Sequence, residues 1–366
     1  MSKKGRVLVA MSGGIDSTVT AMLLHEEGYE VVGITMKTWD YANSGAVGKE
    51  TGCCSLDSIN DAREVAVRMG FHHFIIDIRE EFGDYVINNF VDEYLAGRTP
   101  NPCVLCNTHI KWSSLLKRAD ALDCEFIATG HYARVKSHDD RKFIAKAKDL
   151  NKDQSYVLWG LPQECLNRTI FPLAELVKPE VREIAYQGGF HELSKKSESY
   201  EICFVPDNDY RSFLKHRVPE LEKTLEGGLF MDEHGQVIGR HQGYPFYTIG
   251  QRKGLGIAFG KPMFVTKIIP EKNIVVLGEI EALMKNGVKV HKINAMKYAK
   301  IPLELEVTTQ IRYNDKGSLS KVLFSDEDKV NIEFYSNAKG IAPGQSAVFY
   351  EGDDVVGGGI IYDSLN

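Results

Sequence analysis

A serine- and glycine-rich turn near the N-terminus, Ser12–Ser17 (Ser-Gly-Gly-Ile-Asp-Ser), is the part of the sequence with the most specific chemistry. It follows the apolar run Val7–Ala10 and precedes residues with the apolar spacing of a helix, so it lies on a strand-to-helix turn. Glycines let the backbone approach a ligand closely, and a helix N-terminus offers unpaired N–H groups and a positive dipole end. The pattern predicts a loop that binds a polyphosphate.

This loop is not a Walker loop, because the Gly-Lys-Ser/Thr ending is missing and we expect no lysine to reach a terminal phosphate. An ordinary glycine turn is the alternative, but the serines at both ends and Asp16 argue against it. The loop resembles the pyrophosphate loop of ATP pyrophosphatases, which cleave ATP between the α and β phosphates and adenylate an oxygen. The residues that this resemblance places on the nucleotide are Ala10, Met11, Ser12, Gly13, Gly14, Ile15, Asp16 and Ser17.

Three of the seven cysteines are candidates for thiol chemistry. Cys103 and Cys106 form a Cys-x-x-Cys between X-Pro steps and a helix predicted to begin near Asn107. A thiolate at a helix N-terminus is stabilised by the dipole, so we expect Cys106 to be more acidic than a free thiol. Cys203, in a short apolar run, is by itself typical of a buried core thiol. A structural zinc site would need a second Cys-x-x-Cys or a suitably spaced His pair, so no metal site is predicted.

Alternating strand and helix patterns over the first 130 residues provide the frame for these groups. Apolar strands at 7–10, 31–36, 74–78 and 125–129 are separated by helical segments and short connections, which predicts an α/β fold with a doubly wound parallel sheet. Ligands of such sheets bind at the carboxyl ends of the strands. We therefore expect the loops after Ala10, Met36 and Thr129 to share one edge.

The pattern changes near residue 208, which predicts three domains. Residues 1–207 form the nucleotide-binding and catalytic domain, 208–282 a small strand-rich central domain, and 283–366 a C-terminal β-barrel. The barrel is predicted from short strands at 303–311, 319–324, 330–334, 346–350 and 355–361. Residues 285–321 are basic and residues 322–366 are acidic. On charge alone, we interpret these stretches as solvated faces of a strand-rich domain rather than as a surface that binds nucleic acid.

The composition is that of an ordinary soluble protein, with 366 residues, 43% hydrophobic residues and a net charge of −6. No signal peptide and no apolar run of about 20 residues is present, so no membrane partner is predicted. We expect a cytoplasmic location, where cysteines are mostly reduced.

Motifs along essentially the whole chain resemble the tRNA-specific 2-thiouridylase family in type and order. The adenine nucleotide α-hydrolase-like fold belongs to this resemblance. The motifs are Ala10–Ser17, Thr99–Asn107, Thr129–Tyr132, Lys152–Ser155, Ile202–Phe204, Gly250–Gly256, Arg312–Tyr313 and Pro343–Gln345.

The resemblance implies ATP-dependent 2-thiolation of a wobble uridine in tRNA, with ATP and Mg²⁺ as cofactors. The C2 oxygen of the uridine would attack the α-phosphate of ATP, so that AMP becomes the leaving group. Sulfur would arrive as a persulfide on Cys203. It would reach C2 by direct attack, or Cys106 would attack the persulfide, forming a Cys106–Cys203 disulfide and releasing hydrosulfide.

The resemblance also implies binding residues and partners. Met36 and Gly130 would line the nucleotide, and Asn101, Pro102 and Cys103 would approach the flipped base. Some members of the family have an aspartate, cast as an acid–base residue, where this chain has Cys103. The expected partners are tRNAs for Lys, Glu and Gln and a sulfur donor such as a cysteine desulfurase or a relay protein. The residues expected against tRNA are His131, Lys152, Asp153, Gln154, Arg312, Tyr313 and Gln345.

Three other functions fit parts of the pattern. Cys103, Cys106 and Cys203 could bind a [4Fe–4S] cluster in an iron–sulfur-dependent tRNA thiolase. A small-molecule synthetase with a pyrophosphate loop would leave the C-terminal strands unexplained. A non-catalytic RNA-binding protein would have no use for an intact Ser-Gly-Gly-x-Asp-Ser loop.

Overall fold

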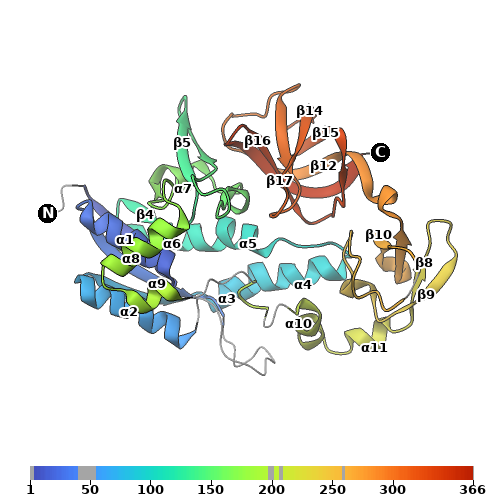
Figure 1. Ribbon diagram of the computed structural model, residues 1–366, viewed down its shortest axis with the longest axis horizontal. Helices are drawn as coiled ribbons and strands as arrows, with labels where there is room; N and C mark the ends of the chain where they lie inside the picture. The colour runs from blue at the N-terminus through green and yellow to red at the C-terminus, as the bar shows by residue number, and fades with distance from the viewer. Residues whose placement is uncertain (1–3, 40–54, 197–201, 206–208, 258–259, 366) are drawn as a thin grey trace. The chain divides into compact units, whose positions relative to one another are not determined.

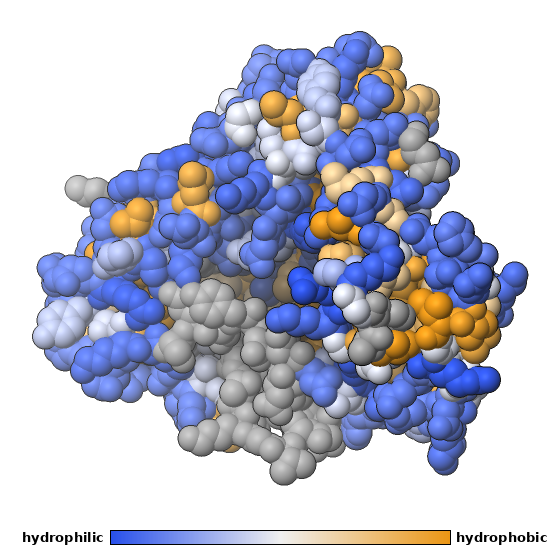
Figure 2. All heavy atoms as spheres, turned by 45° about the vertical axis from the view of Figure 1, so that its right-hand side comes forward, coloured by the Kyte–Doolittle hydropathy of each residue, from blue (hydrophilic) through white to orange (hydrophobic). Residues whose placement is uncertain are grey.

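The computed structural model describes residues 4–39, 55–196, 202–205, 209–257 and 260–365, so Cys53 and Cys54 lie outside the described residues. The chain forms two compact units (Figure 1). The first unit comprises Met1–Val86, Cys103–Asn208 and Asp353–Val355; the second comprises Ile87–Pro102, Asp209–Gly352 and Val356–Asn366. The face drawn in Figure 2 is mostly hydrophilic. No helix in the described part of the chain is long and apolar enough to cross a membrane.

The first unit is built on a five-stranded sheet of order β3-β2-β1-β4-β7, in which each neighbouring pair is parallel. The order reverses between β2 and β4, on either side of β1, which is the topology of a doubly wound fold. The predicted α/β class with a parallel sheet is therefore confirmed. The strands are β1 (Arg6–Ala10), β2 (Glu30–Lys37), β3 (His72–Asp77), β4 (Phe126–Ala128) and β7 (Thr169–Ile170).

Helices packed on this sheet complete the core of the first unit. Apolar residues of β1, such as Val7 and Val9, are fully buried together with Val19 of α1 and Val181 of α8. An antiparallel hairpin of β5 (Arg134–His138) and β6 (Arg141–Ala145) was not predicted. The helices are α1 (Ile15–Glu26), α2 (Leu56–Met69), α3 (Arg79–Phe82), α5 (Pro102–Leu105), α6 (Trp112–Ala121), α7 (Gln163–Arg168), α8 (Lys178–Gln187) and α9 (His191–Lys195), with the π-helices η2 (Gly83–Ile87) and η3 (Cys106–Lys111) and the 3₁₀ helix η4 (Ser155–Leu158).

The helix that carries the Cys-x-x-Cys begins earlier than predicted. It starts at Pro102 and runs through α5, η3 and α6 without a break. Proline suits the first helical position, because its missing N–H needs no partner there. Cys103 therefore lies in the first turn and Cys106 in the second, so the prediction that Cys106 occupies the helix N-terminus is wrong. Cys106 instead opens a π-helical segment, a feature common at functional sites.

The second unit contains a small sheet and a barrel. The sheet has the order β10-β11-β8-β9. Helix α4 packs against α10, with the Phe90 ring against Phe213 and the Tyr94 ring against Tyr210. These elements are α4 (Asn88–Leu95), α10 (Tyr210–Arg217), α11 (Leu221–Leu225), β8 (Gly228–Met231), β9 (Val237–His241), the 3₁₀ helix η6 (Tyr244–Phe246), β10 (Phe264–Ile269), the 3₁₀ helix η7 (Pro270–Lys272), β11 (Ile274–Gly278) and the 3₁₀ helix η8 (Ile280–Leu283).

The predicted C-terminal barrel is confirmed, and it closes through pairing of its first and last strands, β12 and β17. The sequence analysis missed β12, because its lysines and His291 interrupt the apolar pattern even though Val288 and Val290 are fully buried. Asp354, at the start of β17, pairs with Ala145 of β6 within the first unit. The barrel strands are β12 (Met284–Ala295), β13 (Glu306–Gln310), β14 (Ser318–Ser325), β15 (Lys329–Lys339), β16 (Ser346–Glu351) and β17 (Asp354–Leu365).

Candidate active site

The glycine-rich loop joins β1 to α1 and has a backbone that only glycine can adopt at one position. Gly13 has a φ of +69°, and a Cβ there would lie 1.9 Å from the carbonyl oxygen of Ser58. Gly14 is the N-cap of α1. The Ser17 hydroxyl donates to the Gly14 carbonyl at 3.0 Å and accepts from the Ser12 amide at 3.2 Å. The loop is thus held in a tight turn at the N-terminus of a helix, the arrangement that binds phosphates.

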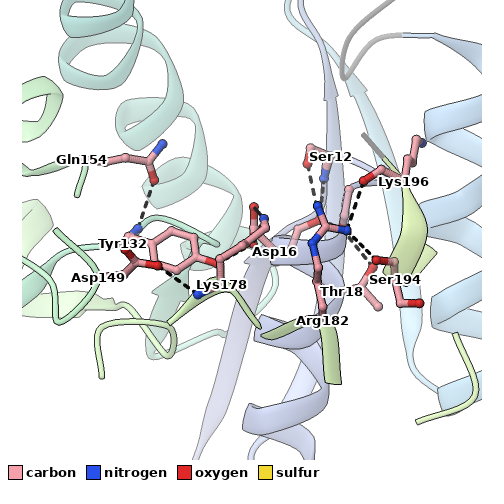
Figure 3. Close-up of polar contacts among 12 residues, drawn as sticks. Ser12, Asp16, Thr18, Tyr132, Asp149, Gln154, Lys178, Arg182, Ser194 and Lys196 are labelled. Carbon is pink, nitrogen blue, oxygen red and sulfur yellow. Dashed lines mark hydrogen bonds and ion pairs between the residues drawn. The ribbon is translucent and has the colours of Figure 1, made fainter. Parts of the chain in front are cut away.

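Asp16 is held by two partners from distant parts of the chain (Figure 3). The Lys178 ammonium lies 2.7 and 2.8 Å from the two carboxylate oxygens, and the Tyr132 hydroxyl donates to one of them at 2.8 Å. The Lys178 side chain is only 8% exposed, against 33% for Asp16. A charge this far from water needs a partner, so the carboxylate fixes the ammonium at the loop. A lysine from a distant part of the chain therefore lies at the loop, although the sequence of the loop itself contains none.

Lys178 is the first residue of α8, and the start of this helix positions its side chain. Its backbone N–H donates to the Asp149 carboxylate at 2.9 Å, and the N–H of Val177 donates to the Glu180 carboxylate at 2.8 Å. Both bonds satisfy amides at the start of a helix, where no intrahelical acceptor exists. The backbone is thereby fixed where the side chain enters the site.

A second lysine reaches the loop at Gly13. The Lys196 ammonium donates to the Gly13 carbonyl at 3.2 Å and to the Asp61 carboxylate at 2.7 Å. The Arg182 guanidinium donates to the carbonyls of Ser194 and Lys196, which fixes the end of α9 (Figure 3). Lys178 and Lys196 are 162 and 183 residues from their loop partners, and no local pattern in the sequence marks either of them.

The loop after β4 lies directly against the glycine-rich loop Ser12–Ser17 (the phosphate loop). A Cβ added to Gly130 would lie 2.8 Å from the carbonyl carbon of Asp16 and 2.9 Å from the amide nitrogen of Ser17. Met36 lies near the end of β2, beside Thr35, whose hydroxyl donates to the Met11 carbonyl at 2.8 Å. The loops after β1, β2 and β4 therefore share one edge of the sheet, as expected for parallel strands.

Cys106 and Cys203 both lie on segments that pack beside α3. Cys106 is buried, and η3, which it opens, contacts α3. Cys203 is half-buried in a turn, and the next residue, Phe204, packs edge-on against Phe82 of α3 at 5.7 Å. Cys103 is exposed.

The arrangement of these thiols does not form a metal site. Within the part of the chain that the structure describes, no three His, Cys, Asp or Glu side chains are close enough together to hold a metal ion. Cys103, Cys106 and Cys203 are among the described residues, and one of them is exposed whereas another is buried. The geometry gives no support to the iron–sulfur alternative.

His131 and the turn at 152–154 have structural contacts of their own. Burial lowers the pKa of His131 to about 3, and its ring bonds Thr129 at 2.8 Å, so the imidazole is neutral at pH 7. Asp153 accepts from the Ala147 amide and the Ser155 hydroxyl, and burial raises its pKa.

Gln154 accepts from the amide of Tyr132 at 3.0 Å (Figure 3). Because the Tyr132 hydroxyl bonds Asp16, this turn is linked to the phosphate loop through a single residue. Lys152, in the same turn, is half-buried.

The other residues predicted to contact the base or the tRNA belong to the second unit, with the exception of Cys103, which belongs to the first. Those of the second unit lie in two places. Gln345 donates to the carbonyls of Thr99 and Pro100 at 3.0 and 2.9 Å, which fixes the loop that contains half-buried Asn101 and buried Pro102. Arg312 and Tyr313 follow β13 and are exposed.

Comparison with protein families and curated proteins covers nearly the whole chain. Residues 5–207 match the model described as tRNA methyl transferase HUP domain, residues 211–279 the tRNA methyl transferase PRC-barrel domain, and residues 285–361 the aminomethyltransferase beta-barrel domain.

Three curated relatives share the name tRNA-specific 2-thiouridylase MnmA. The protein of Amoebophilus asiaticus is 64% identical over 99% of this chain and 96% of its own length. The proteins of Cytophaga hutchinsonii and Salinibacter ruber are 62% and 58% identical, over 100% and 99% of this chain and 99% and 96% of their own lengths. At this identity and coverage, the chain belongs to the tRNA-specific 2-thiouridylase family.

Proposed function

We propose that this chain catalyses the ATP-dependent 2-thiolation of the wobble uridine of tRNA, in the cytoplasm. The observation that carries the proposal is an intact phosphate loop with two lysines at it, in the same unit as the thiols of Cys106 and Cys203. The high identity to proteins named thiouridylases over the whole chain supports it.

The first half of the reaction activates the uridine. Its C2 oxygen attacks the α-phosphate of ATP, pyrophosphate leaves, and the base carries AMP on that oxygen. The amides at the start of α1 and the ammonium groups of Lys178 and Lys196 stabilise the negative charge of the phosphates in this step. Mg²⁺ is commonly held by one or two carboxylates together with substrate phosphates. The Asp16 carboxylate at the loop would hold this ion, and the ion would neutralise charge on the departing pyrophosphate.

The second half transfers sulfur from a persulfide on Cys203. By the direct route, the terminal sulfur attacks C2 and displaces AMP, and a thiol then cleaves the sulfur–sulfur bond to Cys203. By the other route, the Cys106 thiolate attacks Cys203, forms a disulfide and releases hydrosulfide, which displaces AMP from C2. Either route consumes two electrons from a thiol reductant in each turnover.

We further propose how the substrate and donor are bound. Asn101, Pro102 and Cys103 contact the extruded uridine, in keeping with the rule that RNA is recognised at unstacked bases. The tRNA substrates are those for Lys, Glu and Gln, and the sulfur donor is a cysteine desulfurase or a relay protein. The C-terminal domain, residues 283–366, contacts tRNA. Contacts to tRNA come from His131, Lys152, Asp153, Gln154, Arg312, Tyr313 and Gln345.

A reconstituted reaction tests the proposal. Purified protein, ATP, Mg²⁺, unmodified tRNA, a cysteine desulfurase and cysteine are combined, and the digested tRNA is analysed for 2-thiouridine by mass spectrometry. We expect a product that requires both ATP and Cys203. Pyrophosphate release with a small acceptor, without any thiolated base, would assign the chain to the small-molecule synthetases instead.

A further inference from the structure

We propose that the loop Gly250–Gly256 of the second unit is a binding site for RNA phosphates. It presents the side chains of Arg252 and Lys253 to solvent. The inference deepens the proposed function and rests on it, because it assigns a further contact to the same tRNA substrate.

The Gln251 side chain locks this loop from within. Its carbonyl oxygen accepts from the Thr248 amide at 3.1 Å, and its amide nitrogen donates to the Lys253 carbonyl at 2.9 Å. Gly250 and Gly254 have φ values of +84° and +72°, which glycine adopts without strain. The loop is further tied to β10 by two backbone bonds with Val265, at 2.8 and 3.0 Å. The two cations are thus carried on a fixed turn.

The cations on this turn are left without acidic partners. Arg252 and Lys253 are exposed, and neither makes an ion pair or a side-chain hydrogen bond with any other described residue. Arg211 adds a third cation, because its guanidinium nitrogen lies 3.6 Å from the position of a Cβ on Gly254. The Arg211 guanidinium also lies over the Tyr247 ring at 5.6 Å, which orients it. Three cations therefore lie on or beside one fixed turn, and no described carboxylate neutralises the two that the turn carries.

The position of the loop connects it to the barrel residues expected against tRNA. A Cβ on Gly250 would lie 4.0 Å from the Cα of Gly340, and a Cβ on Gly340 would lie 4.0 Å from a guanidinium nitrogen of Arg312. Gly340 therefore lies between the loop and Arg312. Lys339, next to Gly340, holds its ammonium over the Phe264 ring at 4.9 Å.

This arrangement suits an RNA backbone better than a compact ligand. The cations come from α10, the loop, β15 and the end of β13, so they form a strip of separate charges rather than a pocket. Cations in a strip bind successive phosphates, and exposed Tyr313 beside Arg312 offers a ring on which a base can stack. The net charge of −6 makes such a local strip necessary for binding a polyanion.

Binding of unmodified tRNA to the full chain, measured by fluorescence anisotropy over a range of salt concentrations, tests the proposal. For Arg252→Ala with Lys253→Ala, we expect about tenfold weaker binding at low salt. The slope of log K against log salt should fall by about 1.4 to 1.8, since each lost phosphate contact removes about 0.7 to 0.9. Gln251→Ala keeps both charges but frees the loop, and should weaken binding about threefold.

The matched control removes two lysines elsewhere in the same unit, Lys223→Ala with Lys272→Ala. Its affinity and slope should equal those of the wild type. An unchanged slope in the Arg252/Lys253 variant, with wild-type tRNA binding intact, would overturn this inference alone. A loss of affinity equal in variant and control would overturn it too, because it would reflect net charge only. Failure of the wild type to bind or thiolate tRNA would instead overturn the proposed function.

Discussion

The phosphate loop of the first unit and the loop Gly250–Gly256 of the second (the Gln251 loop) are both glycine-rich turns with cations beside or on them, but they differ in how those cations are paired. At the phosphate loop, Lys178 bonds Asp16 and Lys196 bonds Asp61. At the Gln251 loop, Arg252 and its neighbour have no acidic partner among the residues described. The first arrangement holds charges at fixed points for a ligand of one shape, and the second leaves charges free for a flexible polymer.

The difference has a physical consequence. Partly buried ion pairs are screened weakly by salt, whereas exposed charges are screened within a Debye length of about 8 Å at physiological ionic strength. ATP binding should therefore vary little with salt, while tRNA binding should vary steeply.

Removal of the sulfur-carrying thiol should have the largest effect. Cys203→Ser should abolish 2-thiouridine formation while tRNA-dependent pyrophosphate release from ATP continues, because adenylation does not use the thiol. Mass spectrometry of digested tRNA and a pyrophosphate assay measure the two steps. Persistent thiolation would rule out the persulfide on Cys203. Cys106→Ser separates the two routes, because only hydrosulfide release requires that thiol.

Gly13→Ala should disrupt the phosphate loop. A Cβ would lie 1.9 Å from the Ser58 carbonyl oxygen, so the backbone of the loop or of α2 must move. We expect nucleotide binding to be lost and the free energy of unfolding to fall by about 1–3 kcal/mol. Gly70→Ala is the matched control, since Gly70 also has a positive φ, of +75°, with no atom within 4 Å of its Cβ position. Equal effects in both variants would show that the positive φ, and not the clash with Ser58, causes the loss of binding and stability.

Lys178→Met should weaken adenylation by about tenfold to a hundredfold, the size expected for one charge-assisted hydrogen bond of about 1.5–3 kcal/mol. Pyrophosphate release at varied ATP concentration measures it. Lys148→Met is the control, because Lys148 pairs with Glu180 at 3.5 Å on the surface, and such pairs contribute little. If the Lys178 variant kept wild-type rates, the buried lysine would have no part in the reaction.

His131 should have the smallest effect, seen only as acid sensitivity. Its pKa in the folded chain is about 3, below the ordinary value of 6.5, so the unfolded state binds the proton more readily. The stability that neutral His131 contributes is complete above pH 6.5 and is lost as the pH falls toward 3. Urea unfolding at pH 7 and pH 5 should show a smaller loss for His131→Gln than for the wild type. An equal loss would mean that other groups account for the acid sensitivity.

The sequence predicted the features that depend on local pattern. The strand-to-helix turn at Ser12–Ser17, the parallel sheet and the C-terminal barrel follow from apolar periodicity, glycines and capping residues, and the structure confirms them. The Cys-x-x-Cys helix starts five residues before its predicted start at Asn107, because proline is typical of loops but also suits the first helical position, which Pro102 occupies.

The partners of the loop could not be predicted, because they are brought there by tertiary packing. Lys178 and Lys196 come from α8 and the end of α9, and each looks like an ordinary surface lysine in the sequence. Strand β12 was missed for a related reason: its exposed face carries lysines, and only barrel closure shows that Val288 and Val290 face a core.

A single-turnover reaction follows the sulfur atom from Cys203 to the wobble uridine. The chain is loaded with a labelled persulfide on Cys203, freed of donor, and mixed with ATP, Mg²⁺ and unmodified tRNA. The proposed chemistry predicts that about one labelled sulfur per loaded chain moves to the wobble uridine, and only when ATP is present. Pyrophosphate release with the label still on the protein would contradict it.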